Sequence, residues 1–161
     1  MKTHLISCDL EIPLPIEPVF AFFSKAENLE RITPPELRFE ITSPKPVEVF
    51  EGAIISYRLR LYGIHFGWKT RILEWRPGDR FVDEQVAGPY RLWRHRHEFE
   101  QVPDRTVIRD RIAYALPFFP LGELVFPAVR SQLKRIFRFR QAKVIACLGQ
   151  EPRACKWHVN C

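Results

Sequence analysis

The sequence predicts an α+β fold in which a long C-terminal helix crosses the concave face of a curved, antiparallel sheet of seven strands. Seven strand-like segments follow one another through short connections, which is typical of antiparallel sheets. Behind them, apolar residues recur every three or four positions over residues 121–148, which is the period of an amphipathic helix. The apolar stripe of such a helix must be buried, and the sheet is the only large surface available.

The first strand is expected at residues 5–12, where apolar and polar residues alternate until Pro13 ends the pairing. Two short helices follow, beginning near Pro18 and ending at Pro34 and Pro35, because proline removes a helical hydrogen bond. Alternation and turn residues place the remaining strands at residues 37–42, 54–61, 64–75, 81–86, 90–100 and 106–116.

The composition supports one globular unit, which we expect to span residues 1–148 with a short tail at 149–161. Of the 161 residues, 46% are hydrophobic and 13% aromatic, which is enough to build a core. The formal net charge is +6, and no acidic residue occurs over residues 124–150. This basic helix face suits a protein partner or an anionic surface. Nucleic acid is not expected, because the aromatic residues alternate into the sheet and leave no exposed stacking platform.

The four cysteines are scattered, and no signal peptide precedes them, so we expect a reducing, cytoplasmic location. In the tail, Cys155, His158 and Cys161 give only three metal ligands, which is too few for a structural zinc site. No transmembrane segment is expected, because prolines interrupt the longest apolar run. Within that run, residues 117–122 (PFFPLG) are expected to pack against the fold or to rim a pocket, with peripheral membrane contact as the alternative.

The most informative stretch is residues 80–99, RFVDEQVAGPYRLWRHRHEF. Residues two apart on a strand share a face, so Trp93, His95, His97 and Phe99 point to one side and the charged residues between them to the other. Two imidazoles on an aromatic face are unusual in a plain core. They are typical of a pocket that is mostly apolar with a few directed polar groups.

The order of elements resembles the helix-grip fold of the START-like or SRPBCC superfamily, which includes birch-pollen-allergen-like and polyketide cyclase/dehydrase-like proteins. A bacterial SRPBCC subgroup, often labelled cell-division inhibitors, is similar in its pattern of Phe81, Asp83, Gln85, Gly88, Pro89, Tyr90, Trp93, His95, His97 and Phe99, followed by Asp110, Tyr114, Pro117, Gly122, Ile136, Phe137 and Arg140. The resemblance covers residues 3–148. It implies a deep cavity between sheet and long helix that binds a small hydrophobic molecule or lipid, in carriers, sensors and a minority of enzymes.

Strand parity and this resemblance together define the expected ligand-binding residues: Tyr57, Trp68, Asp83, Gln85, Trp93, His95, His97, Phe99, Asp110 and Tyr114. The polar members have three interpretations. They form a closed hydrogen-bond network that only stabilises the sheet, they bind the polar head of a ligand, or His95, His97 and Asp110 transfer protons in a cyclase- or dehydratase-like reaction. Binding by a carrier or sensor is preferred over catalysis.

A metal could be shared by His95, His97 and either Asp83 or Asp110, because two histidines and a carboxylate form a recognised type of site. Nothing else in the sequence requires a metal, and the resemblance implies none. The sequence therefore predicts neither a metal nor a cofactor.

Overall fold

The computed structural model describes residues 1–61 and 63–149, and the backbone of 156–158. Strand β1 (His4–Ile12) precedes two short helices, α1 (Ile16–Phe23) and α2 (Asn28–Arg31), and the turn η1 (Pro35–Leu37). The strands that follow are β2 (Glu40–Ile41), β3 (Ile54–Leu61), β4 (Ile64–Arg76), β5 (Arg80–Ala87), β6 (Leu92–Val102) and β7 (Arg105–Ala115). A turn, η2 (Leu121–Val125), leads into the long helix α3 (Phe126–Cys147), and β8 (Lys156–His158) comes last.

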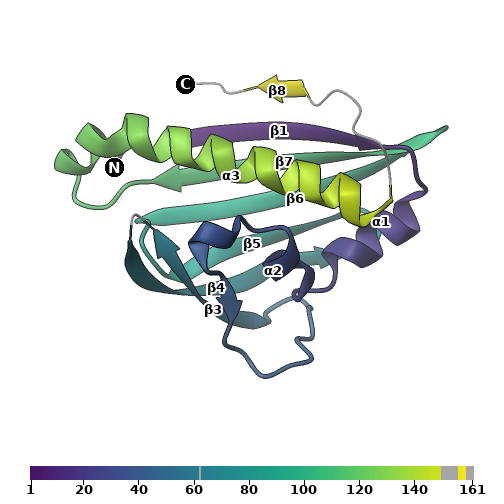
Figure 1. Cartoon of the computed structure of the whole chain (residues 1–161), viewed down its shortest axis with the longest axis horizontal. Helices are drawn as coiled ribbons and strands as arrows, with labels where there is room; N and C mark the ends of the chain where they lie inside the picture. The colour runs from purple at the N-terminus through teal and green to yellow at the C-terminus, as the bar shows by residue number, and fades with distance from the viewer. Residues whose placement is uncertain (62, 150–155, 159–161) are drawn as a thin grey trace.

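All seven expected strands are present, and the α+β helix-grip arrangement predicted from the sequence is confirmed. The sheet is antiparallel in the order β2-β3-β4-β5-β6-β7-β1-β8. Figure 1 shows α3 lying across one face of this sheet, with α1 and α2 on the same side. The second strand is shorter than expected, because Pro34 and Pro35 open the turn η1 where the sequence suggested extended chain. In the tail, β8 adds an eighth strand by pairing with Ser7–Asp9 of β1, although no structure was expected there.

The core fills the space between the sheet and the helices. Strand β1 illustrates the alternation, because Ile6, Cys8, Leu10 and Ile12 are all buried. The stripe of α3 that faces the sheet consists of Leu133, Phe137, Gln141, Val144 and Ile145. One apolar cluster surrounds the aromatic residues of β3, β4 and β6, and a second joins α1 to the far half of α3. Along β6, Trp93 belongs to the first cluster and Phe99 to the second. His95 and His97 come between these two residues on the same strand.

The expectation that residues 117–122 pack against the fold or rim a pocket is wrong. Phe118 is 84% exposed, and Phe119 and Leu121 are 56% and 71% exposed. His4 of β1 holds the turn η2 in place. Its Nε2 lies 2.9 Å from Glu123 Oε2, and its ring stacks on Phe126 at the start of α3. The apolar residues of η2, Leu121, Leu124 and Val125, are exposed to solvent. No helix within the described residues is long and apolar enough to cross a membrane.

We expect Gly122→Ala to destabilise the protein by about 1–3 kcal/mol, the usual cost of forcing extra volume into a packed site. A Cβ atom at Gly122 would overlap the backbone carbonyl oxygen of Pro117. The matched control is Gly67→Ala, because Gly67 is exposed on β4 and has open space around it. Urea unfolding should show Gly67→Ala neutral or slightly stabilised. Equal effects of the two substitutions would contradict the close approach at η2.

Candidate ligand-binding cavity

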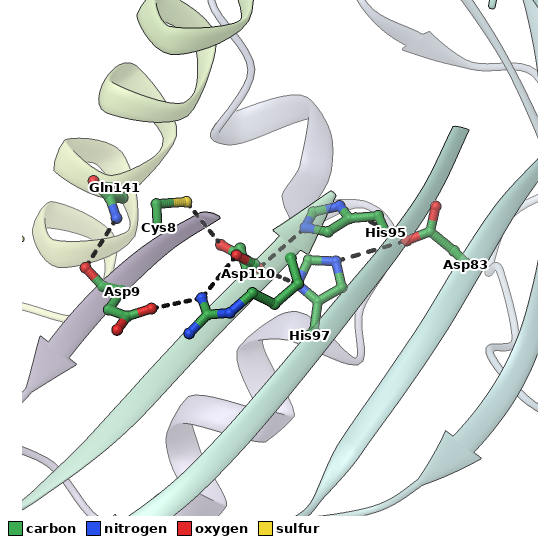
Figure 2. Close-up of polar contacts among 8 residues, drawn as sticks. Cys8, Asp9, Asp83, His95, His97, Asp110 and Gln141 are labelled. Carbon is green, nitrogen blue, oxygen red and sulfur yellow. Dashed lines mark hydrogen bonds and ion pairs between the residues drawn. The ribbon is translucent and has the colours of Figure 1, made fainter. Parts of the chain in front are cut away.

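Two aspartates and two histidines meet on the inner face of three neighbouring strands. The register places Asp83 of β5 opposite His95 of β6, and His97 of β6 opposite Asp110 of β7. The side chains of His95 and His97 are only 4% and 5% exposed. Figure 2 shows the two imidazoles side by side, with Asp110 on one side of them and Asp83 on the other.

Asp110 holds both imidazoles through one carboxylate oxygen. Its Oδ1 lies 3.1 Å from His95 Nε2 and 2.7 Å from His97 Nδ1. The contact with His95 has hydrogen-bond geometry, whereas the ring of His97 is turned so that its contact is a close ion pair without a well-directed hydrogen bond. On the opposite side, Asp83 Oδ2 lies 3.9 Å from His95 Nδ1 and 3.7 Å from His97 Nε2. Each ring nitrogen therefore faces a carboxylate.

Burial and the neighbouring charges shift the pKa of each of these three buried groups. Burial alone would raise the pKa of Asp110, but the charge of His97 and the contacts from both imidazoles hold that pKa well below its usual range. Burial likewise opposes a charge on His97, yet Asp110 and Asp83 outweigh burial and raise the pKa of His97. Burial and the charge of His97 lower the pKa of His95. These shifts favour an ionised Asp110 and make His97 the easier of the two rings to protonate, while His95 Nε2–H donates to Asp110.

Beside these side chains, the sheet and the helices enclose a cavity of about 180 Å³. Its wall is mostly apolar, with contributions from α1, β3, β4, β6 and α3. Aromatic rings dominate one end, where Trp68 and Trp93 meet edge to face at 5.3 Å and Tyr57 lies 6.1 Å from Trp68 between ring centroids. Asp83, His95 and His97 form a polar section of the wall, the polar end, and the other polar or charged lining residues are Lys25, Asn28, Thr33, Thr70 and Arg140. This combination matches the general make-up of small-molecule sites.

The structure divides the ten residues expected from the sequence into two groups. Six line the cavity, namely Tyr57, Trp68, Asp83, Trp93, His95 and His97. The remaining four, Gln85, Phe99, Asp110 and Tyr114, are not part of its wall. Gln85 closes the turn after β5, since its Nε2 donates to the carbonyl of Tyr90 at 2.7 Å and its Oε1 accepts from the amide of Tyr90. Asp110 stands behind the histidines, Phe99 packs among the rings of α1, and Tyr114 is fully buried.

Several cavity residues were not among those expected from the sequence. Leu133, Ile136 and Phe137 of α3 close the cavity, and Arg140 lies on its wall with its guanidinium 5.3 Å from the centre of the Phe137 ring. The sequence suggested that the arginines of α3 all lie on its outer face. The helical period does place Arg140 one turn after Ile136, which was the available signal. Cys8 also joins the cluster, since its thiol lies 3.8 Å from Asp110 Oδ2 and burial raises its pKa.

Among the described residues, Asp83, His95 and His97 each offer one donor atom, and these atoms lie within 4.8 Å of one another. They form the group best placed to hold a cation. The Cys155 and Cys161 pair considered from the sequence lies outside the described residues.

A curved antiparallel sheet that grips a long helix around an apolar cavity defines the helix-grip class of START-like proteins. A family model described as polyketide cyclase / dehydrase and lipid transport matches residues 12–138, so the chain belongs to this family. Comparison with curated proteins gives no significant sequence match.

Solved structures agree on the fold. The Zhui aromatase/cyclase from Streptomyces superposes with a TM-score of 0.75 at 12% identity, covering 95% of this chain and 98% of that one. A START superfamily protein from Mycobacterium smegmatis superposes with a TM-score of 0.64 at 15% identity, and the match covers 89% of this chain and 99% of that one. A nucleoside-diphosphate sugar epimerase from Corynebacterium glutamicum gives 0.64 at 24% identity, and there the match covers 89% of this chain but 29% of that one. At these identities the likeness concerns the fold alone.

We expect Asp110→Asn to lower the free energy of unfolding by about 3–5 kcal/mol, because removing one partner of a buried ion pair leaves His97 with only its longer contact of 3.7 Å to Asp83. The control is Asp9→Asn, which breaks a pair with Arg111 on the solvated face of the sheet, where side chains are 30% and 39% exposed. That change should cost about 0–1 kcal/mol. Urea unfolding measures both.

The pH dependence of the stability of wild type and Asp110→Asn shows whether Asp110 stabilises the protein through its charge or through packing. The raised pKa of His97 contributes stability that is complete below its unfolded value and lost as the pH rises through the folded value. The lowered pKa of Asp110 contributes stability that is complete above its unfolded value and lost in acid. The stability difference between wild type and Asp110→Asn should therefore be largest between about pH 4 and 6.5. A difference that does not change with pH would assign Asp110 a packing role only.

Proposed function

We propose that the protein binds a small hydrophobic ligand in the cavity between the sheet and α3, and acts as a carrier or sensor in the cytoplasm. The observation that carries the proposal is the space beside the histidines: a closed hydrogen-bond network with no other role would not require a cavity of about 180 Å³. A cavity of about 150 Å³ in an engineered core already holds benzene. The free thiols of Cys8 and Cys147 support a reducing compartment.

The wall indicates how such a ligand would be oriented. Its apolar body would contact the rings of Tyr57, Trp68 and Trp93, where burial contributes about 25 cal/mol per Å² of apolar surface. Its polar head would lie at the end formed by Asp83, His95 and His97, where donors and acceptors are already ordered. Because burying a polar atom without a partner costs about 1–3 kcal/mol, this end favours a ligand with one oxygen- or nitrogen-bearing head. Arg140 adds a positive charge to the same wall.

Filling the cavity from the helix should abolish binding. Leu133→Trp adds an indole at a buried position on the cavity wall, whereas Ser131→Trp adds the same group at an exposed position of the same helix. We expect Leu133→Trp to weaken binding of anilinonaphthalene sulfonate, an apolar fluorescent dye, by at least about tenfold, and Ser131→Trp to leave it unchanged. Dye titration measures the affinity, and circular dichroism checks that both variants fold. Equal dye affinities in the two variants would remove the basis of the proposal.

A carrier and an enzyme differ in what happens to the ligand. Mass spectrometry of the purified protein identifies a co-purified molecule, which is then incubated with the protein again. A carrier returns it unchanged. A chemically altered product whose formation stops in His97→Ala would replace the carrier function with catalysis.

The exposed turn of η2 supports a second feature of this function, contact with a membrane surface that supplies the apolar ligand. Phe118, which precedes η2, and Leu121 and Leu124 of η2 expose large apolar side chains to solvent, and exposed apolar patches often mark an interaction surface. Basic side chains lie beside the turn, with Lys2 Nζ 6.0 Å from the centre of the Phe126 ring and Arg130 on the first turns of α3. A cationic rim favours an anionic membrane by about 1 kcal/mol for each charge.

We therefore expect the protein to sediment with phosphatidylcholine vesicles, and more strongly when they contain phosphatidylserine. Leu124→Asp should weaken vesicle binding by about tenfold or more, because one buried apolar side chain contributes about 1.5–3 kcal/mol. Ile54→Asp, at an exposed apolar position on β3, is the control and should bind like wild type. Loss of binding in both variants, or in neither, would exclude η2 as the contact surface.

A further inference from the structure

We propose that Asp83, His95 and His97 form a binding site for one divalent transition-metal ion, with Zn²⁺ as the best-suited ion, at the polar end of the cavity. This site goes beyond ligand binding by the apolar wall and does not depend on it. Both features share the same cavity, so an ion bound there would face whatever molecule occupies it.

The spacing of the donor atoms fits one ion. Zinc binds imidazole nitrogen at about 2.0–2.1 Å and carboxylate oxygen at about 2.0–2.2 Å, so a nitrogen and an oxygen bound to one ion lie at most about 4.3 Å apart. Asp83 Oδ2 is 3.9 Å from His95 Nδ1 and 3.7 Å from His97 Nε2. These separations are too long for hydrogen bonds and short enough for an ion between the atoms. The three donor atoms all lie within 4.8 Å of one another, so a small contraction completes the site.

The carboxylate of Asp110, which is not itself a proposed ligand, gives an independent reason to expect a metal site. A metal-binding histidine usually donates its other ring N–H to a carboxylate or carbonyl, which fixes the tautomer and aims the free lone pair at the metal. Asp110 Oδ1 accepts this hydrogen bond from His95 Nε2 at 3.1 Å, and it lies 2.7 Å from His97 Nδ1 in a close contact of less ideal direction. The nitrogens that remain, His95 Nδ1 and His97 Nε2, are the two that face Asp83. Figure 2 shows this order of carboxylate, imidazole pair and carboxylate across three strands.

The ligand set and its surroundings select the class of ion. Imidazole suits zinc, copper, iron and nickel, whereas Ca²⁺ and Mg²⁺ require more oxygen ligands than this wall provides. Three protein ligands leave at least one coordination position open, and all three residues line the cavity. That position is available to water or to an oxygen atom of a bound molecule.

The test is titration of the full-length protein with Co²⁺ and Zn²⁺, followed by calorimetry and, for Co²⁺, by visible absorption. We expect saturation at one equivalent and a rise in melting temperature, because an ion that binds only the folded state stabilises it. Asp83→Asn and His95→Gln should each weaken binding by more than about 100-fold, and Asp110→Asn by about 10–100-fold, the usual effect of changing an outer carboxylate.

Two control variants remove other sources of metal binding. His65→Gln takes away an exposed histidine on β4, and the double variant Cys155→Ser with Cys161→Ser takes away the thiols of the tail. Both should retain the Co²⁺ spectrum and the stoichiometry of wild type. The proposal is overturned if wild type binds no ion at one equivalent, if the tail variant loses the signal, or if a folded Asp83→Asn binds as tightly as wild type. Circular dichroism confirms folding, and Asp83→Asn preserves the shape of the side chain if His95→Gln is unstable.

Discussion

One carboxylate, that of Asp110, organises the site. It lies on β7, behind the two imidazoles of β6, and a single oxygen atom contacts both rings. A buried carboxylate is unfavourable unless it is paired, and so is a buried imidazolium. Each group is tolerated because the other is present. The pairing fixes which nitrogen of His95 carries a proton, and it leaves the opposite edges of both rings directed toward Asp83 and the cavity. The chemistry available at the wall follows from a residue that is not itself on the wall.

The cavity exists because the curved sheet and α3 cannot pack against each other along their full length. Near its C-terminal end, α3 makes ordinary core contacts through Val144 and Ile145, which pack with the residues of α1. Toward its N-terminal end, Leu133 and Phe137 meet the aromatic residues of β3, β4 and β6 across the cavity. The two halves of one helix therefore have different tasks, with the first closing a binding space and the second stabilising the fold.

Both proposed surfaces depend on how the ends of the sheet are connected. The turn before α3 is fixed to β1 by the contact of His4 with Glu123, and its apolar side chains are exposed to solvent. The turn between β5 and β6 is closed by Gln85, which bonds to the backbone of Tyr90 on the cavity wall. Gln85, which the sequence alone would assign to a ligand, holds a chain connection instead.

The sequence by itself determined the order of the elements, the antiparallel sheet and the inward direction of Trp93, His95 and His97. These features follow from periods of two and of three to four residues, which depend only on local backbone geometry. The sequence also paired Asp83 and Asp110 with the histidines, because consecutive antiparallel strands are neighbours. Only the tertiary structure decided that Asp110 stands behind the rings while Asp83 reaches the cavity, that Gln85 closes a turn, and that Arg140 lies on the wall. Strand alternation predicts on which face of the sheet a side chain lies, but not whether it reaches the cavity. That depends on the curvature of the sheet and the position of α3.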